Sequence, residues 1–459
     1  MLDPHMIGPS GNGLPEAGRV RLPWPWQLFD PERSGALALA ASTLASLLIA
    51  ALLQVSLAAA LGLVVLIVAG AFVARRGVMG VALLLAGALP WLVVFSAVEP
   101  KLAETFAAGT MVVVLLVVAA PRDDGSRALA RLRLGMILFY LPVVIGLARA
   151  PHGAQIIEAL KYIVFPFTVY AVIAGTNDSA LQQLSRVAFT SGAIAITFNL
   201  LAGLGGLNHS YYAAGDIQGL GGQHDLALLA GAITAASLAR GTSLKWASMS
   251  AIGAIATLAT GVRSTLPGLL LALVAKMFRA GARARGFVMV ALVTAAVLVS
   301  GVGNVLVQRF HHDQSLGEFS SFDALGSGRG GIYTTAIHGW WVSSPLNWAY
   351  GTGLRSVELI EERATGNDVV GQSDVIQAGV ELGLIGLIGL VLIWWTLIAR
   401  ARSKLPLLVL LPFAVFNGSL EYGAPLVVTL LLTVSPADDA KEPAGERITR
   451  PPLPAAPDG

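Results

Sequence analysis

Residues 375–398 read "VIQAGVELGLIGLIGLVLIWWTLI", and Glu381 is the only charged side chain among them. An α-helix needs about 20 mainly apolar residues to cross the hydrocarbon core of a bilayer. The run is therefore predicted to be a transmembrane helix. The whole chain has 459 residues, of which 55% are hydrophobic and only 12% charged. Such a composition has too much apolar surface for one soluble core, so we predict an all-α polytopic membrane protein.

Similar apolar runs follow one another along most of the chain, and they predict about 12–14 transmembrane helices by the same length criterion. The runs lie near residues 36–53, 55–74, 78–97, 107–120, 134–149, 160–176, 187–207, 226–239, 246–261, 264–277, 287–305, 375–398, 406–418 and 423–434. Only Val262 and Arg263 separate the ninth run from the tenth, and the two runs after residue 405 are short. Residues 1–34 are polar and do not resemble a cleavable signal peptide.

The positions of the basic residues indicate how the chain is oriented. If the runs alternate across the membrane from a cytoplasmic N-terminus, most of the 30 Lys and Arg residues fall on the cytoplasmic side. This distribution fits the positive-inside rule. It predicts a cytoplasmic tail (1–34), transmembrane helices (35–305), a large external loop (306–372), further transmembrane helices (373–434) and a disordered cytoplasmic tail (435–459).

Several classes of site are not expected in this chain. It has no cysteine, so disulfides and thiolate metal sites are excluded. No group of carboxylates or histidines has the spacing of metal ligands, and we predict neither a metal nor a cofactor. The pI of about 9.2 is explained by the cytoplasmic loops, and no nucleic-acid partner is expected.

Three polar residues mark the predicted outer end of the 375–398 helix. Asp374, Gln377 and Glu381 lie within about 60° of one another on a helical wheel. A carboxylate about two turns inside a membrane helix should face a water-filled cavity or a partner, and we consider these residues candidate site residues. The alternatives are that Asp374 caps the helix and that Glu381 pairs with an arginine of a neighbouring helix.

Arginines near the outer surface are the second group of candidates. Arg263 lies in "LATGVRSTLPGLLLAL" and Arg329 in "GSGRGGIYTTAIHGWW". Guanidinium groups beside a hydrophobic cavity suit a lipid phosphate or diphosphate, which they bind in bidentate fashion. Interfacial snorkelling is the alternative. His224 and Asp225 in "QHD" open the eighth run much as Gln372 to Asp374 open the twelfth, and are second-tier candidates for which capping is the alternative.

At these residues the chain resembles the O-antigen ligase and polymerase family of bacterial membrane proteins. The resemblance covers roughly residues 210–398 and rests on three stretches together. They are "GVRSTLPGLLLAL" (261–273), "GRGGIYTTAIHGWWVSSPLNWAYGTGL" (328–354) and "QSDVIQAGVELGLIG" (372–386). In the last stretch Gln377, Glu381 and Gly383 fall on the family's offsets, and Tyr333 belongs to the second.

One position departs from the family pattern. The family's histidine falls on Gln372, so its role would pass to Asp374 or to another histidine, with His338 and His224 among those available. The ligase branch depends most on that histidine. The departure therefore favours the polymerase branch.

The resemblance implies a GT-C-like, inverting and metal-independent glycosyltransferase in the bacterial inner membrane. It would join polyprenyl-diphosphate-linked oligosaccharide units into O-antigen, capsule or exopolysaccharide. Arg263 and Arg329, with Arg309, would neutralise the leaving diphosphate, and Asp374 or Glu381 would be the general base. Membrane lipid and a chain-length regulator protein are the further partners that it implies. The alternatives are a ligase that transfers glycan to a lipid A core or another acceptor, and a flippase or transporter.

Overall fold

The protein is represented by a computed structural model, and the described residues are 70, 72–95, 101–122, 124–149, 153–204, 222–278, 283–301, 329–365 and 373–434. The chain divides into two compact units, Met1–Phe72 and Val73–Gly459, and nearly all of the described residues belong to the second. Some predictions lie outside the described residues: both tails, the run 36–53, most of 55–74, residues 306–328 and 366–372 of the external loop, Arg309 and Gln372.

The described part of the chain is helical, which confirms the all-α prediction. Two residues, Pro121 and Gly175, form an isolated β-bridge. The α-helices are α3 (Val78–Val94), α4 (Lys101–Ala119), α5 (Arg127–Arg149), α6 (Gly153–Ala174), α7 (Asp178–Leu204), α8 (Gln223–Arg240), α9 (Leu244–Ala259), α10 (Thr265–Phe278), α11 (Arg283–Val299), α14 (Arg329–Trp341), α15 (Pro345–Tyr350), α16 (Ser356–Thr365), α17 (Asp374–Arg400), α18 (Leu405–Asn417) and α19 (Gly423–Leu432). A 3-10 turn, η2 (Ser419–Glu421), joins the last two helices.

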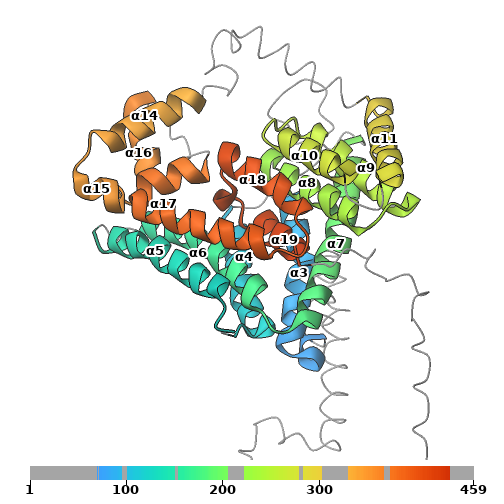
Figure 1. Cartoon of the computed structure of the whole chain (residues 1–459), viewed down its shortest axis with the longest axis horizontal. Helices are drawn as coiled ribbons and strands as arrows, with labels where there is room; N and C mark the ends of the chain where they lie inside the picture. The colour runs from blue at the N-terminus through green and yellow to red at the C-terminus, as the bar shows by residue number, and fades with distance from the viewer. Residues whose placement is uncertain are drawn as a thin grey trace, which may run out of the picture. The chain divides into compact units, whose positions relative to one another are not determined.

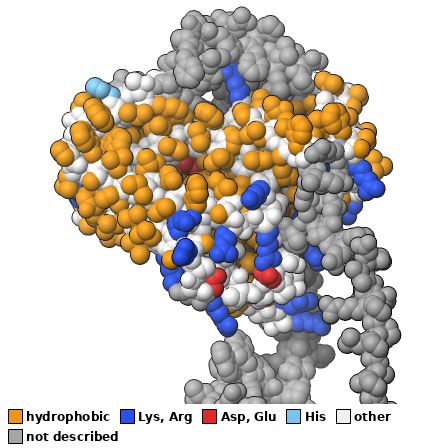
Figure 2. Space-filling view, viewed as in Figure 1, with side chains coloured by type: hydrophobic (Ala, Val, Ile, Leu, Met, Phe, Trp, Pro, Cys, Tyr) orange, Lys and Arg blue, Asp and Glu red, His pale blue; other side chains and the backbone are white. Residues whose placement is uncertain are grey.

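Among the described helices, α5, α7 and α17 are long and apolar enough to cross a membrane. Most of the others are shorter apolar helices of 10 to 17 residues. Figure 2 shows hydrophobic side chains as a broad band across the visible surface, with Lys and Arg side chains gathered below it. An apolar surface of this kind suits lipid rather than water, so these features indicate a membrane protein.

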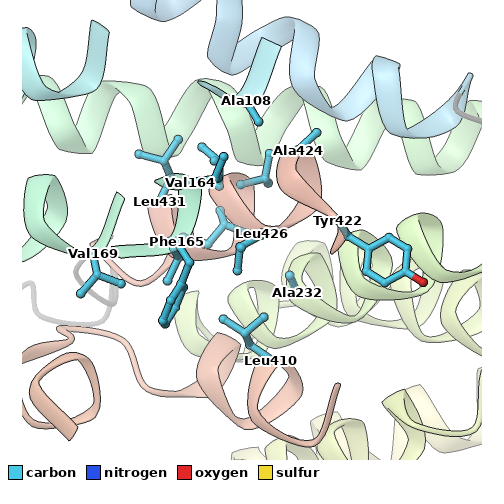
Figure 3. Close-up of a cluster of buried hydrophobic side chains, with 14 of the residues drawn as sticks. Ala108, Val164, Phe165, Val169, Ala232, Leu410, Tyr422, Ala424, Leu426 and Leu431 are labelled. Carbon is cyan, nitrogen blue, oxygen red and sulfur yellow. The ribbon is translucent and has the colours of Figure 1, made fainter. Parts of the chain in front are cut away.

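The core is built around two helices that are buried on every side. Every residue of α19 is buried, as is nearly every residue of α8. A helix that is apolar all round belongs in the interior rather than at a surface. Figure 3 shows α19 side chains such as Leu426 and Leu431 among residues of other helices, including Ala108 of α4, Phe165 of α6 and Leu410 of α18.

Helices α17 and α5 pack closely because glycine lets their backbones approach (Figure 1). A Cβ added at Gly389 would lie 2.5 Å from the backbone nitrogen of Phe139, and one added at Gly135 would lie 3.1 Å from the carbonyl oxygen of Gly389. Small residues at such contacts are typical of helix packing in membranes, where close van der Waals contact replaces the hydrophobic effect.

The described part of the predicted external loop, residues 329–365, forms the three helices α14, α15 and α16. All three pack on α17 (Figure 1). Trp341 and Trp348 stack with their ring centroids 5.0 Å apart and link α14 with α15. This helical group therefore rests on the α17 segment that carries the predicted site residues.

Candidate functional site

The site forms at two breaks in helical structure. One is the turn between α18 and α19, and the other is an interruption of α17 at Gly383. Helix α18 ends at Asn417, and Gly418 with φ of 72° turns the chain into η2 and then α19. The backbone N–H of Ser403, before α18, donates to the carbonyl oxygen of Thr433, after α19, at 2.9 Å. Helices α18 and α19 are thus a hairpin with its two ends together. We call residues 417–422 the hairpin tip.

Asp374 holds the hairpin tip. Its Oδ2 accepts a hydrogen bond from the Ser419 hydroxyl at 2.5 Å, and its Oδ1 accepts one from the backbone N–H of Leu420 at 3.0 Å. The Asp374 side chain is buried. The helix cap is instead Ser373, whose side chain accepts from the backbone N–H of Ile376. Both oxygens of Asp374 are therefore engaged in fixing the polar tip inside the helix bundle.

Gln377 and Lys161 both bind Glu421, the last residue of η2. The Glu421 Oε2 forms an ion pair with the Lys161 Nζ at 2.6 Å, and its Oε1 accepts from the Gln377 Nε2 at 3.3 Å. The Glu421 side chain is 5% exposed and that of Lys161 20%. A largely buried carboxylate needs such a cation and such donors to remain charged.

Glu381 lies one turn further along α17 and is bound by α6. The Tyr162 hydroxyl donates to the Glu381 Oε2 at 2.7 Å, and both side chains are buried. Gly383 then interrupts α17, with φ of 71° and ψ of −172°. A residue with positive φ cannot continue a helix, and carbonyl groups in the preceding turn must find other donors.

Those donors come from residues 351–353, which we call the glycine turn. The backbone N–H of Thr352 donates to the carbonyl oxygen of Val380 at 2.9 Å, and that of Gly353 donates to the carbonyl oxygen of Glu381 at 3.3 Å. Glycine is required at the contact, because a Cβ on Gly351 would lie 2.0 Å from the backbone carbonyl oxygen of Glu381. The glycine turn and the break in α17 thus fit each other through their backbones.

The second-tier candidates lie beside the hairpin tip. The His224 Nδ1 is 2.6 Å from the Asn417 Nδ2, and the His224 and Tyr422 rings are 5.9 Å apart. Asp225, in the first turn of α8, is buried. Residues that open the eighth and twelfth predicted runs therefore both contact the same short segment.

The remaining predicted residues are placed in other elements. Arg263 is partly exposed in the turn before α10, a helix that packs on α8 and α18. Arg329 is the first residue of α14. The Tyr333 hydroxyl donates to the carbonyl oxygen of Phe416 at 3.3 Å, next to the hairpin tip, whereas His338 is exposed.

Sequence reasoning missed five residues of this cluster: Lys161, Tyr162, Asn417, Ser419 and Glu421. A signal for the last three was present. The polar stretch "NGSLEY" interrupts two apolar runs that are short for membrane crossing. Helices α18 and α19, with 13 and 10 residues, are indeed only about 20 and 15 Å long, well short of the roughly 30 Å hydrocarbon core.

The cluster gathers three carboxylates, one ammonium and one phenol at interrupted helices. Broken backbone at membrane depth is tolerated where it is covered by protein or lines a cavity. The chemistry available is proton transfer and hydrogen bonding to a polar substrate. Among the described residues there is no group of three or more His, Asp and Glu that could hold a metal ion.

A comparison of the sequence with protein-family models finds no match, and a comparison with curated proteins finds none either. The resemblance to the O-antigen ligase and polymerase family stays a prediction.

Proposed function

We propose that this chain is a membrane glycosyltransferase of the GT-C type. In this proposal it polymerises polyprenyl-diphosphate-linked oligosaccharide units at the outer face of the bacterial inner membrane, with both termini in the cytoplasm. One observation supports it above the others. The glycine turn, from one stretch of the family resemblance, docks through its backbone on Val380 and Glu381, which belong to another.

The same region brings further parts of the resemblance together. Tyr333 reaches the end of α18, and α14, which begins with Arg329, packs on α17. The remaining stretch, residues 261–273, contains Arg263 and leads into α10 beside α18. Stretches far apart in the sequence therefore surround the hairpin tip and the outer half of α17, as expected if they serve one reaction.

In the proposed reaction an acceptor hydroxyl attacks C1 of the donor sugar, and the bond between C1 and the diphosphate oxygen breaks. The hydroxyl proton passes to a carboxylate, and the negative charge on the leaving diphosphate is neutralised by Arg263 and Arg329. Of the two candidate bases we assign the role to Glu381. The reason is that both oxygens of Asp374 already bind the hairpin tip.

The test is to reconstitute the purified protein in liposomes with polyprenyl-diphosphate-linked repeat unit alone and to size the glycan on a gel. A ladder that steps by one repeat unit supports a polymerase. Transfer that appears only after a lipid A core is added supports the ligase. Glu381→Gln should abolish the ladder. The control Asp178→Asn, which removes an exposed carboxylate paired with Arg402 at the start of α7, should keep it.

A carrier is the second candidate, because interrupted helices beside buried charges also form the substrate sites of transporters. The interruption at Gly383 next to Glu381 is the observation that favours it. A labelled lipid-linked unit that crosses the liposome membrane without any change in glycan length would support the carrier and contradict the glycosyltransferase.

A further inference from the structure

A second polar region lies about 24 Å along α8 from His224, by the helical rise, at the residue where α8 ends. There a cavity of about 580 Å³ opens between α7 and α9. Its lining includes Arg186 of α7, Arg240 of α8 and Lys245 of α9. None of the described lining residues is acidic. The cavity, which we call the basic cavity, therefore has a positive lining and suits an anion.

Aromatic rings hold two of the three cations at this cavity, Arg240 and Lys245. The Arg240 guanidinium carbon lies 3.6 Å from the centroid of the Phe189 ring and 5.7 Å from that of Trp246. The Arg240 side chain is only 5% exposed. The Lys245 Nζ lies 4.9 Å from the Trp246 ring centroid. Cations held over ring faces are preorganised. The binding of an anion there therefore costs little conformational entropy of the Arg240 and Lys245 side chains.

Beyond the cations the cavity is apolar. Ile194, Phe198 and Leu201 also line it, and they are 56%, 41% and 62% exposed. Their spacing of four and three residues places them on one face of α7, the face that begins with Arg186. From Arg186 to Leu201 this face extends about 22 Å, somewhat more than the roughly 15 Å of half a hydrocarbon core. The basic cavity thus has three cations at one end and an exposed apolar stripe of α7 at the other.

We propose that the basic cavity binds an anionic phospholipid from the bilayer. Its phosphate lies between Arg186, Arg240 and Lys245, and an acyl chain runs along Ile194, Phe198 and Leu201. Charge complementarity selects the anionic head group, and the apolar stripe selects a lipid over a soluble anion. The proposal does not rest on the glycosyltransferase activity, because the cavity and the hairpin tip lie near opposite ends of α8.

The experiment is native mass spectrometry of the full-length protein in detergent, titrated with phosphatidylglycerol, with phosphatidylcholine or with inorganic phosphate. We expect one phosphatidylglycerol per chain to bind at a much lower lipid concentration than phosphatidylcholine does. Arg186→Gln and Lys245→Gln, both at exposed positions, should each weaken phosphatidylglycerol binding roughly fivefold. Arg240 is left intact because it is buried. Lys404→Gln removes an exposed cation outside the cavity and should change nothing.

Each other outcome overturns the proposal. Equal binding of the two phospholipids would show that charge does not select the ligand. If Lys404→Gln weakened phosphatidylglycerol binding as much as Arg186→Gln and Lys245→Gln do, the binding would depend on the general surface charge and not on this cavity. Complete displacement of phosphatidylglycerol by millimolar inorganic phosphate would show a site for a soluble anion, in which the apolar stripe has no role.

Discussion

Asp374→Asn is expected to destabilise the protein by about 1.5–3 kcal/mol, because the Asp374 carboxylate holds the hairpin tip. It accepts from the Ser419 hydroxyl at 2.5 Å and from the Leu420 backbone N–H at 3.0 Å. In asparagine one acceptor oxygen becomes an NH2 donor. The asparagine oxygen can still accept from the Leu420 N–H, but its NH2 group then faces the Ser419 oxygen. The Ser419 hydroxyl proton would lose its acceptor in a site from which water is excluded.

The size of the effect follows from the charge of the acceptor. Hydrogen bonds to charged groups are worth about 1.5–3 kcal/mol, whereas neutral hydrogen bonds between membrane helices average about 0.6 and reach about 1.7 kcal/mol. Asp374→Asn loses one bond of the first kind. Ser419→Ala removes the same bond from the other side, so the two changes together should destabilise by less than the sum of their separate effects.

The assay is unfolding of the purified protein by increasing SDS in mixed micelles, followed by far-UV circular dichroism, for the wild type, both single variants and the double variant. A coupling of about 1 kcal/mol or more between the two sites is the expected result. Wild-type stability of Asp374→Asn together with loss of glycan polymer would refute this reasoning. Such a result would identify Asp374 as the general base.

Three further predictions concern backbone fit and charge. Gly383→Ala should destabilise the protein and abolish polymer, because the φ of Gly383 is 71° and an added Cβ would lie 2.4 Å from the backbone nitrogen of Gly351. Gly379→Ala is the control for both assays, because its Cβ would lie 3.9 Å from the nearest atom, the Cδ2 of Leu387. Gly389→Val should lower the SDS midpoint by separating α17 from α5, and an unchanged midpoint would contradict the close packing. Glu421→Gln should lower the free energy of unfolding by roughly 3–5 kcal/mol, because it leaves one partner of a largely buried ion pair without the other. The double variant Lys161→Met with Glu421→Gln should regain part of that loss in the same SDS titration.

The local part of the site could be predicted from the sequence. Helical periodicity places Asp374, Gln377 and Glu381 on one face, and all three bind partners on neighbouring elements. The turn between two helices at Val262 and Arg263 also follows from the sequence, since α9 ends at Ala259 and α10 begins at Thr265. These features depend on residues close together in the chain.

The partners could not be predicted, because they depend on tertiary packing. Lys161 and Glu421 are separated by 260 positions, and no periodicity relates them. Hydropathy also hides the break in α17. Gly383, Gly386 and Gly389 look alike in "GLIGLIGL", yet of these only Gly383 has positive φ. What distinguishes it is the glycine turn that docks against it, which comes from another part of the chain.

The energetics of the cluster argue that its charges serve a function. A buried ion pair contributes little net stability, and well-packed apolar side chains of similar volume often stabilise as much or more. The cluster nevertheless combines the Lys161–Glu421 pair with Glu381 and Asp374, at two interrupted helices deep in an apolar bundle. Stability alone would favour uninterrupted apolar helices at these positions. Polar groups inside a membrane protein are costly and typically mark the pathway or site of a polar substrate. The hairpin tip and the N-terminal half of α17 are therefore where substrate chemistry should be sought first, whether the substrate is transferred or carried.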